Sequence, residues 1–146
     1  PFNNYILSIR LTGQQIRDAL EYGVSGIEAK EGRFPQVSGI SFAYSPAREA
    51  GKRIAAIRIA GKPLELTRHY TVATNDFLAA GGDGYQVFRE AIRQAPDFEI
   101  VGGTIRSSNI VYNDAGRWLR DVVVSEVQKE KKITSAVEGR IRTESK

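Results

Sequence analysis

A chain of 146 residues with 41% hydrophobic side chains is long enough to bury the core of one domain, and at this size neither disulfides nor a structural metal are needed. The chain has no cysteine and one histidine, which excludes a Cys/His zinc site and a thiol nucleophile built from these residues alone. Its 21 basic and 17 acidic residues give a net charge of +4 that is spread along the chain, so nucleic acid is not indicated as a partner. No apolar stretch reaches the roughly 18 to 20 residues that a membrane helix needs.

The first predicted elements are a strand and a helix that follows it directly. Residues 5–11 are rich in β-formers and alternate apolar and polar side chains in their second half, which predicts a strand. Thr12 is the expected N-cap of the helix, with Gln15 three residues on and Gly23 as the stop. The apolar stripe of this helix consists of Ile16, Ala19 and Leu20.

Three more strands are predicted in the middle of the chain. They cover residues 37–44, 53–59 and 70–74, where apolar and β-branched side chains alternate with others. Residues 26–35 are charged and irregular, which suits a surface loop, and the turn at 60–63 indicates that two strands pair there.

Helical spacing returns in the second half of the chain. The first of these helices ends at Pro96, and its apolar positions are Val87, Phe88, Ala91 and Ile92. A second helix is predicted between about residues 114 and 128, with Trp118 as its anchor in the core. Residues 139–143 are expected to close the sheet.

Together these elements predict a single α+β domain over residues 1–146, with mixed β-sheet layers covered by helices. Residues from about 129 to 135 are expected to be linker-like, and residues 143–146 a frayed tail. Because the chain opens on Pro1 and lacks Met, we expect a fragment or a processed form.

The candidate site is the glycine-rich stretch 74–85, Thr-Asn-Asp-Phe-Leu-Ala-Ala-Gly-Gly-Asp-Gly-Tyr. Phe77 offers an aromatic face to a base, Asp83 offers two acceptor oxygens to a ribose diol, and Gly81 and Gly82 permit unusual dihedrals and close approach of a ligand. The alternative is structural, with the phenylalanine in the core, the aspartate capping the next helix and the glycines shaping a turn. The residues alone favour that structural alternative.

The same stretch resembles, almost letter for letter, the signature of the C-terminal domain of the 5'-nucleotidase, UDP-sugar hydrolase and 2',3'-cyclic phosphodiesterase family. Four other segments occur in the family's order. They are Pro-Phe-Asn-Asn at 1–4, Leu-Thr-Gly at 11–13, the GxFxQVSG stretch at 32–39 and Ala-Val-Glu-Gly-Arg-Ile at 136–141. The resemblance implies most of this substrate-binding domain, without its first segment.

The resemblance also implies a division of labour. In the family a two-metal phosphoesterase domain hydrolyses the substrate, and the C-terminal domain binds the nucleoside part. Matched residue by residue, Phe2 and Phe77 sandwich the base, Asp83 binds the ribose, and Gly81 and Gly82 complete the substrate-binding set. For Phe2 the alternative is a frayed terminal residue that packs opportunistically.

No catalytic residue and no metal ligand is expected in this chain. The family's substrate-binding NGGGIR-like segment and its metal ligands lie upstream, so two divalent metals are expected on a missing N-terminal domain, and the chain alone is expected to be inactive. His69 is interpreted as a strand-edge residue, and Arg33, Arg53 and Arg58 as solvated side chains. Phe34 and Tyr85 are expected to shape the surroundings of the pocket.

The expected function is therefore base and ribose recognition for an exported phosphohydrolase acting on 5'-nucleotides or related esters. The expected partners are the nucleotide and the parent's own phosphoesterase domain. One alternative is a non-catalytic nucleotide-binding or interaction module. A third possibility, single-strand nucleic-acid binding through aromatic residues, is disfavoured by the dispersed charge.

Overall fold

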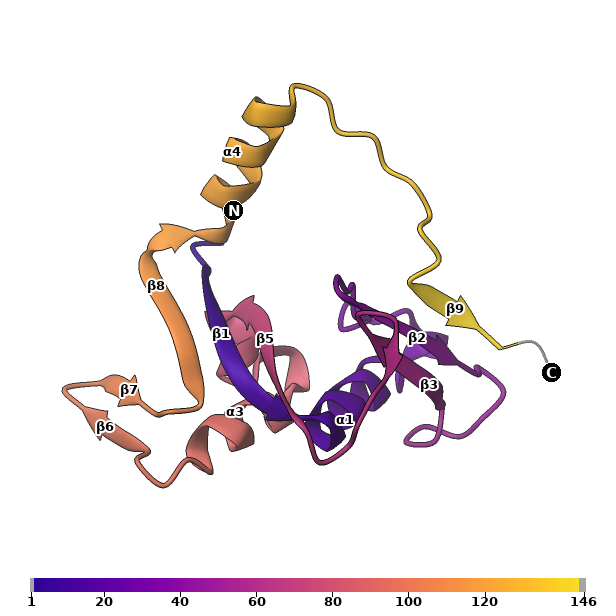
Figure 1. Cartoon of the computed structure of the whole chain (residues 1–146), viewed down its shortest axis with the longest axis horizontal. Coiled ribbons are helices and arrows are strands. Elements are labelled where there is room, and N and C mark those ends of the chain that lie inside the picture. The colour runs from indigo at the N-terminus through magenta and orange to yellow at the C-terminus, as the bar shows by residue number, and fades with distance from the viewer. Residues whose placement is uncertain (1, 145–146) are drawn as a thin grey trace.

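A computed structural model of the chain describes residues 2–144 and confirms the α+β fold (Figure 1). The strands are β1 (Tyr5–Thr12), β2 (Ile40–Tyr44), β3 (Ile54–Ile59), β4 (Lys62–Pro63), β5 (His69–Asn75), β6 (Glu99–Val101), β7 (Thr104–Arg106), β8 (Ile110–Trp118) and β9 (Ile141–Thr143). The helices are α1 (Gly13–Gly23), α2 (Asp76–Ala79), α3 (Gln86–Arg93) and α4 (Leu119–Glu130), and the two 3-10 helices are η1 (Ile27–Ala29) and η2 (Gly82–Gly84).

The first sheet has the order β5-β1-β8, with β1 antiparallel to both neighbours. Its central strand alternates as the sequence predicts, because Leu7, Ile9 and Leu11 are buried on one face. Helices α1 and α3 both contact this strand and each other, so they cover that face and form the core with it.

Helix α1 begins and ends where the sequence predicts. The Thr12 hydroxyl accepts from the Gln15 amide over 3.2 Å, and the Gln15 side chain accepts from the Thr12 amide over 2.8 Å. This reciprocal capping box satisfies two donors that a helix start otherwise leaves free. The predicted apolar stripe of Ile16, Ala19 and Leu20 is buried.

The second sheet has the order β4-β3-β2-β9. Strand β2 is antiparallel to β3 and parallel to β9, which confirms that residues near the C-terminal end join a sheet. Strand β2 begins at Ile40, three residues later than predicted, because Gly39 has a φ of +73° that extended backbone does not allow. Residues 37–39 remain outside the sheet, and Val37 and Ser38 line the pocket described below.

The predicted helix at 114–128 is wrong at its start. Residues 114–118 belong to β8, because that strand pairs with β1 and places Tyr5 opposite Trp118. Trp118 ends the strand as the N-cap residue of α4, half-buried, with the Arg120 guanidinium 4.1 Å from its ring centroid. Helix α4 has no buried residue, so Trp118 does not anchor a helix in the core.

Three further differences concern the predicted loops and the C-terminal tail. Residues 99–106 form a hairpin, β6-β7, which the sequence did not predict because its strands are three residues long and fully exposed. The predicted linker at 129–135 overlaps the end of α4 at Glu130. At the expected frayed tail, Thr143 lies in β9 and the Glu144 amide donates to the Tyr44 carbonyl over 2.9 Å. Pro1 and residues 145–146 lie outside the described residues.

Candidate functional site

The glycine-rich stretch begins where β5 ends, and its first two polar side chains are already used by the fold. The Asn75 side chain accepts from the Leu78 amide over 2.8 Å and caps α2, the single turn that replaces the first part of the predicted loop. The Asp76 carboxylate accepts from the Tyr5 amide over 3.1 Å and ties α2 to the start of β1. These two residues therefore have local structural roles.

The two glycines assigned to the site have different reasons to be glycine. Gly81 has a φ of +91°, a left-handed backbone that side chains rarely adopt. At Gly82 a Cβ would lie 2.5 Å from the Phe77 ring, so the ring rests directly on the backbone there. Both glycines therefore shape the turn, as the structural alternative predicts.

Phe77 is 48% exposed and is therefore not a core residue. Phe2 is 78% exposed. One precedes β1 and the other follows β5, and since these strands are antiparallel, both aromatic residues belong to the same end of the first sheet. The bond between the Tyr5 amide and Asp76 joins the two segments at this end.

Asp83 is exposed and does not cap the following helix, because the N-cap residue of α3 is Tyr85 and no side chain caps that helix. Its backbone is left-handed, with φ of +49° and ψ of +19°. Its carbonyl accepts from the Tyr22 hydroxyl over 2.8 Å. Its carboxylate has no hydrogen-bond partner and no ion pair among residues 2–144, which leaves both oxygens free to accept from a ligand.

Asp83 lies on the wall of the largest pocket found among the described residues, with a volume of about 540 Å³. The floor is apolar and belongs to the core, with Leu11, Leu20 and Phe88 among its residues. One wall is the segment 32–38, which includes Phe34, and Tyr85 and Leu119 also line the pocket. Neither Phe2 nor Phe77 lines it, so the structure brings only one of the predicted site side chains to this pocket.

The segment 32–38 is held against the glycine-rich stretch by Tyr85. Its hydroxyl donates to the Arg33 carbonyl over 2.6 Å, and its ring is 6% exposed. Burial raises the pKa of Tyr85 to about 12, so this hydroxyl stays protonated and able to donate throughout the biological pH range.

Arg33 is not the solvated side chain that the sequence suggested. Its guanidinium lies 4.6 Å from the centroid of the Tyr22 ring, and Nε is 2.9 Å from the Glu31 carboxylate. Contact with Tyr22 raises the pKa of Arg33, so its charge is permanent. Arg33 thus places a fixed positive charge on the pocket wall opposite the glycine-rich stretch.

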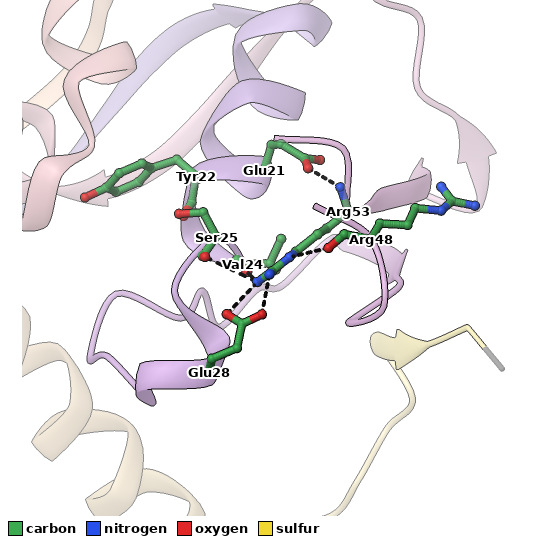
Figure 2. A network of polar contacts seen from close by, with 7 residues as sticks. All are labelled: Glu21, Tyr22, Val24, Ser25, Glu28, Arg48 and Arg53. Carbon is green, nitrogen blue, oxygen red and sulfur yellow. Dashed lines mark hydrogen bonds and ion pairs between the residues drawn. The ribbon is translucent and has the colours of Figure 1, made fainter. Parts of the chain in front are cut away.

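Arg53 is also buried, at 5% exposure, against the expectation of a solvated side chain (Figure 2). It donates to the carbonyls of Val24, Ser25 and Arg48 and pairs with Glu28. Arg53 holds the pKa of the Glu28 carboxyl below its usual value. The network anchors residues 24–28, which connect α1 to the pocket wall. Of the three arginines expected to be solvated, only Arg58 is exposed.

From the other side, the carboxylate of Glu21 accepts from the backbone amides of Arg53 and Ile54. Sequence reasoning missed this carboxylate and Tyr22, because their partners lie between 32 and 61 residues away and leave no local pattern. Arg33 falls in a predicted loop and Arg53 at the start of a predicted strand, and in neither place does the local sequence indicate the ring or the carbonyls that surround the guanidinium.

The described residues do not fit a metal centre. His69 is exposed at the start of β5, an edge strand, and no three His, Asp or Glu side chains between residues 2 and 144 gather closely enough to hold a metal ion. In the same part of the chain, no helix has both the length and the apolar character to cross a membrane.

Comparison with known proteins gives concordant matches. The profile of the family described as 5'-nucleotidase, C-terminal domain, matches residues 1–90. A trifunctional nucleotide phosphoesterase protein of Bacillus subtilis is 42% identical over 96 residues, 62% of this chain and 7% of that protein. A human 5'-nucleotidase is 28% identical over 150 residues, covering 97% of this chain and 23% of that protein.

The crystal structure of a 5'-nucleotidase precursor from Thermus thermophilus matches 98% of this chain and 26% of its own, with a TM-score of 0.75 and 32% identity. This match extends the similarity beyond residue 90, where the family profile ends. The chain spans about a quarter or less of the length of these relatives. By sequence over more than half its length, and by fold over nearly all of it, the chain belongs to the 5'-nucleotidase C-terminal domain family.

Proposed function

We propose that the chain recognises the base and ribose of a nucleotide for a metal-dependent phosphohydrolase that acts on 5'-nucleotides or related esters. One observation carries this proposal. The Asp83 carboxylate stands on a left-handed backbone at the wall of the largest pocket, with no partner among the described residues. An exposed acceptor held in a fixed place suits a ligand that brings hydroxyl donors.

Asp83 and the neighbouring residues offer contacts for both the ribose and the base of a nucleoside. Two hydroxyls of a ribose can donate to one carboxylate, and bonds to a charged acceptor are the stronger ones. The half-exposed ring of Phe77 belongs to the same glycine-rich stretch as Asp83 and offers its surface to a base, with Phe2 at the same end of the sheet. Gly81 and Gly82 complete the proposed site by shaping it: Gly81 permits the left-handed turn, and Gly82 lets the Phe77 ring pack against the backbone. Stacking accepts every base, so we propose no base preference.

Hydrolysis is proposed to take place outside these residues. Phosphoryl transfer needs positive charge around the transferred group, and residues 2–144 do not fit a metal centre. We therefore propose that the phosphohydrolase centre, with its metals, belongs to another part of the whole protein, and that this chain alone releases no phosphate. The names of the relatives, a nucleotide phosphoesterase and a 5'-nucleotidase, support the substrate class. Export of the whole protein is a further part of the proposal.

Calorimetric titration of the purified chain with adenosine, AMP and ribose 5-phosphate tests the proposal. Adenosine and AMP are expected to bind and ribose 5-phosphate is not, because stacking on Phe77 needs a base. Phe77→Ala and Asp83→Ala are each expected to weaken adenosine binding by about tenfold or more. Circular dichroism confirms that each variant is folded.

Two matched controls make the result specific. Tyr112 is an aromatic residue of β8 with 49% exposure, close to that of Phe77, and Asp121 is an exposed carboxylate on α4. Tyr112→Ala and Asp121→Asn are expected to leave adenosine binding unchanged. A folded wild-type chain that binds no adenosine contradicts the proposal. Phosphate release from AMP by the whole protein then separates the hydrolase from a non-catalytic nucleotide-binding module, which would release none.

A further inference from the structure

Asp83 has a left-handed backbone conformation that is unfavourable for a residue with a side chain, so it needs contacts that stabilise it. Asp83 is a non-glycine residue with a left-handed backbone, at φ of +49°; Gly84 directly after it has φ of +83°, and Gly81 two residues before it has φ of +91°. A residue with a Cβ is disfavoured there and persists only where its surroundings hold it in place. The direction of the carboxylate depends on this backbone, so the contact that holds it is part of the binding machinery.

That contact is the hydroxyl of Tyr22. It donates to the Asp83 carbonyl over 2.8 Å, and a Cβ at Gly84 would lie 1.8 Å from the hydroxyl oxygen. The loop therefore rests directly on the hydroxyl. The rings of Tyr22 and Tyr85 pack edge to face with centroids 5.3 Å apart. Through its own bond to Arg33, Tyr85 extends the connection to the opposite pocket wall.

Tyr22 is a firm support because the end of α1 is held from the other side. In Figure 2 the side chain of Glu21 points toward Arg53, whereas Tyr22 points away from that network. The Glu21 carboxylate accepts from the amide of Ile54 over 2.8 Å, which ties this turn of α1 to β3. In the last turn of α1, Glu21 therefore fixes the helix to the second sheet, and the next residue, Tyr22, contacts the glycine-rich stretch.

We propose that Tyr22 is a positioning residue for ribose recognition: its hydroxyl fixes the left-handed backbone of Asp83 and so aims the carboxylate at the ribose diol. The inference rests on the proposed function, since it assigns a purpose to Asp83. Tyr22→Phe removes the hydroxyl alone. The ring remains, and with it the packing on Tyr85 and the stacking of Arg33.

The test compares two ligands that differ only in the diol. The full chain is titrated by calorimetry with adenosine and with 2',3'-dideoxyadenosine, and the ratio of the two Kd values reports the contact with the ribose hydroxyls. A ratio of about ten or more is expected for the wild type, as for hydrogen bonds to a charged group. In Tyr22→Phe the ratio is expected to fall toward one, while the Kd for dideoxyadenosine stays within about twofold.

Two further variants complete the design. In Gly84→Ala the ratio of the two Kd values is also expected to fall toward one, although Tyr22 is intact, because the new methyl group would occupy the position of the Tyr22 hydroxyl. Tyr112→Phe removes a hydroxyl that bonds to Asp114 on β8 and is expected to keep the wild-type ratio. Thermal unfolding is followed for each variant, and Tyr22→Phe is expected to melt close to the wild type because its hydroxyl bond is exposed.

The outcomes separate the two proposals. A wild-type chain that binds both ligands equally, or neither, overturns the role of Asp83 in diol binding and the inference with it. A wild-type chain that prefers adenosine, together with a Tyr22→Phe or Gly84→Ala chain that keeps the full preference, overturns the inference and leaves the proposed function standing. Equal loss of affinity for both ligands in Tyr22→Phe also overturns it.

Discussion

Helices α1 and α4 are nearly equal in length, with 11 and 12 residues, but they differ in capping and in burial. Helix α1 starts with a capping box and buries one face, including Ile16 at 3% exposure. Helix α4 has Trp118 as its N-cap residue, with no side-chain cap, and contains no buried residue; Val123 on it is 54% exposed. Figure 1 shows α4 standing away from the sheets. Apolar residues at helical spacing therefore indicate a helix but not what it packs against.

The largest difference is expected for matched truncations on the two helices. Ile16→Ala should lower the free energy of unfolding by about 2–5 kcal/mol, because it empties space in the core. Val123→Ala should change that free energy by less than about 0.5 kcal/mol, because the side chain is exposed. Urea unfolding followed by circular dichroism measures both. A cost at Val123 equal to that at Ile16 would contradict the contrast between the helices.

A smaller loss is expected when the anchor beside α1 is removed. Arg53→Met keeps much of the side-chain volume but leaves the carbonyls of Val24 and Arg48 without their donor. The free energy of unfolding should fall by about 2 kcal/mol. Arg58→Met on β3 is the control, since Arg58 is exposed and its guanidinium donates to the nearby Gly61 carbonyl over 3.0 Å, its one hydrogen-bond partner among residues 2–144. Equal effects of the two substitutions in urea unfolding would argue against a structural role for Arg53.

The helix starts offer a subtler comparison. Thr12→Ala should cost about 1 kcal/mol, because the Gln15 amide loses its capping acceptor. In the wild type, hydrogen exchange measured by NMR should be slower at the Gln15 amide than at Val122, which lies in the first turns of the uncapped α4. Faster exchange at Gln15 than at Val122 would reverse the ranking of the two helices.

The smallest effect is a pH dependence in the packed region. Burial raises the pKa of Tyr85 to about 12, above the value of about 10 for an unfolded chain. A folded pKa above the unfolded one stabilises the protonated form, so this contribution is complete below about pH 10 and is lost as the pH rises through about 12. Absorbance titration near 295 nm should show a late tyrosine step that Tyr85→Phe removes, whereas Tyr112→Phe on exposed β8 should leave it in place.

The features that the sequence predicted correctly depend on residues that are close to one another in the chain. The alternation of Leu7, Ile9 and Leu11 and the capping pair of Thr12 and Gln15 are set within a few residues, and the structure confirms them. Trp118 was assigned to a helix because its strand exists only through pairing with β1, more than 100 residues away in the chain.

In the candidate site, too, sequence reasoning found the residues that are close together in the chain and missed those that meet through long-range contacts. Sequence reasoning selected Asp83 and the glycines from one continuous stretch, and their assignment to ligand binding stays a prediction. It did not find Tyr22, because that residue meets Asp83 across 61 positions of sequence. Arg33 was interpreted as solvated because nothing near it in sequence announces the ring of Tyr22 beneath its guanidinium.

Titration of the isotope-labelled chain with adenosine, followed by amide NMR, tests the central claim most directly. If Phe77 and Asp83 form the nucleoside site, shifts should concentrate on the glycine-rich stretch 74–85 and its support at Tyr22. They should be absent from residues 123–130 of α4, away from the pocket-lining Leu119, and from the β6-β7 hairpin. Saturable shifts confined to α4, or no saturable shift in a folded chain, would contradict the assignment of nucleoside recognition to this stretch.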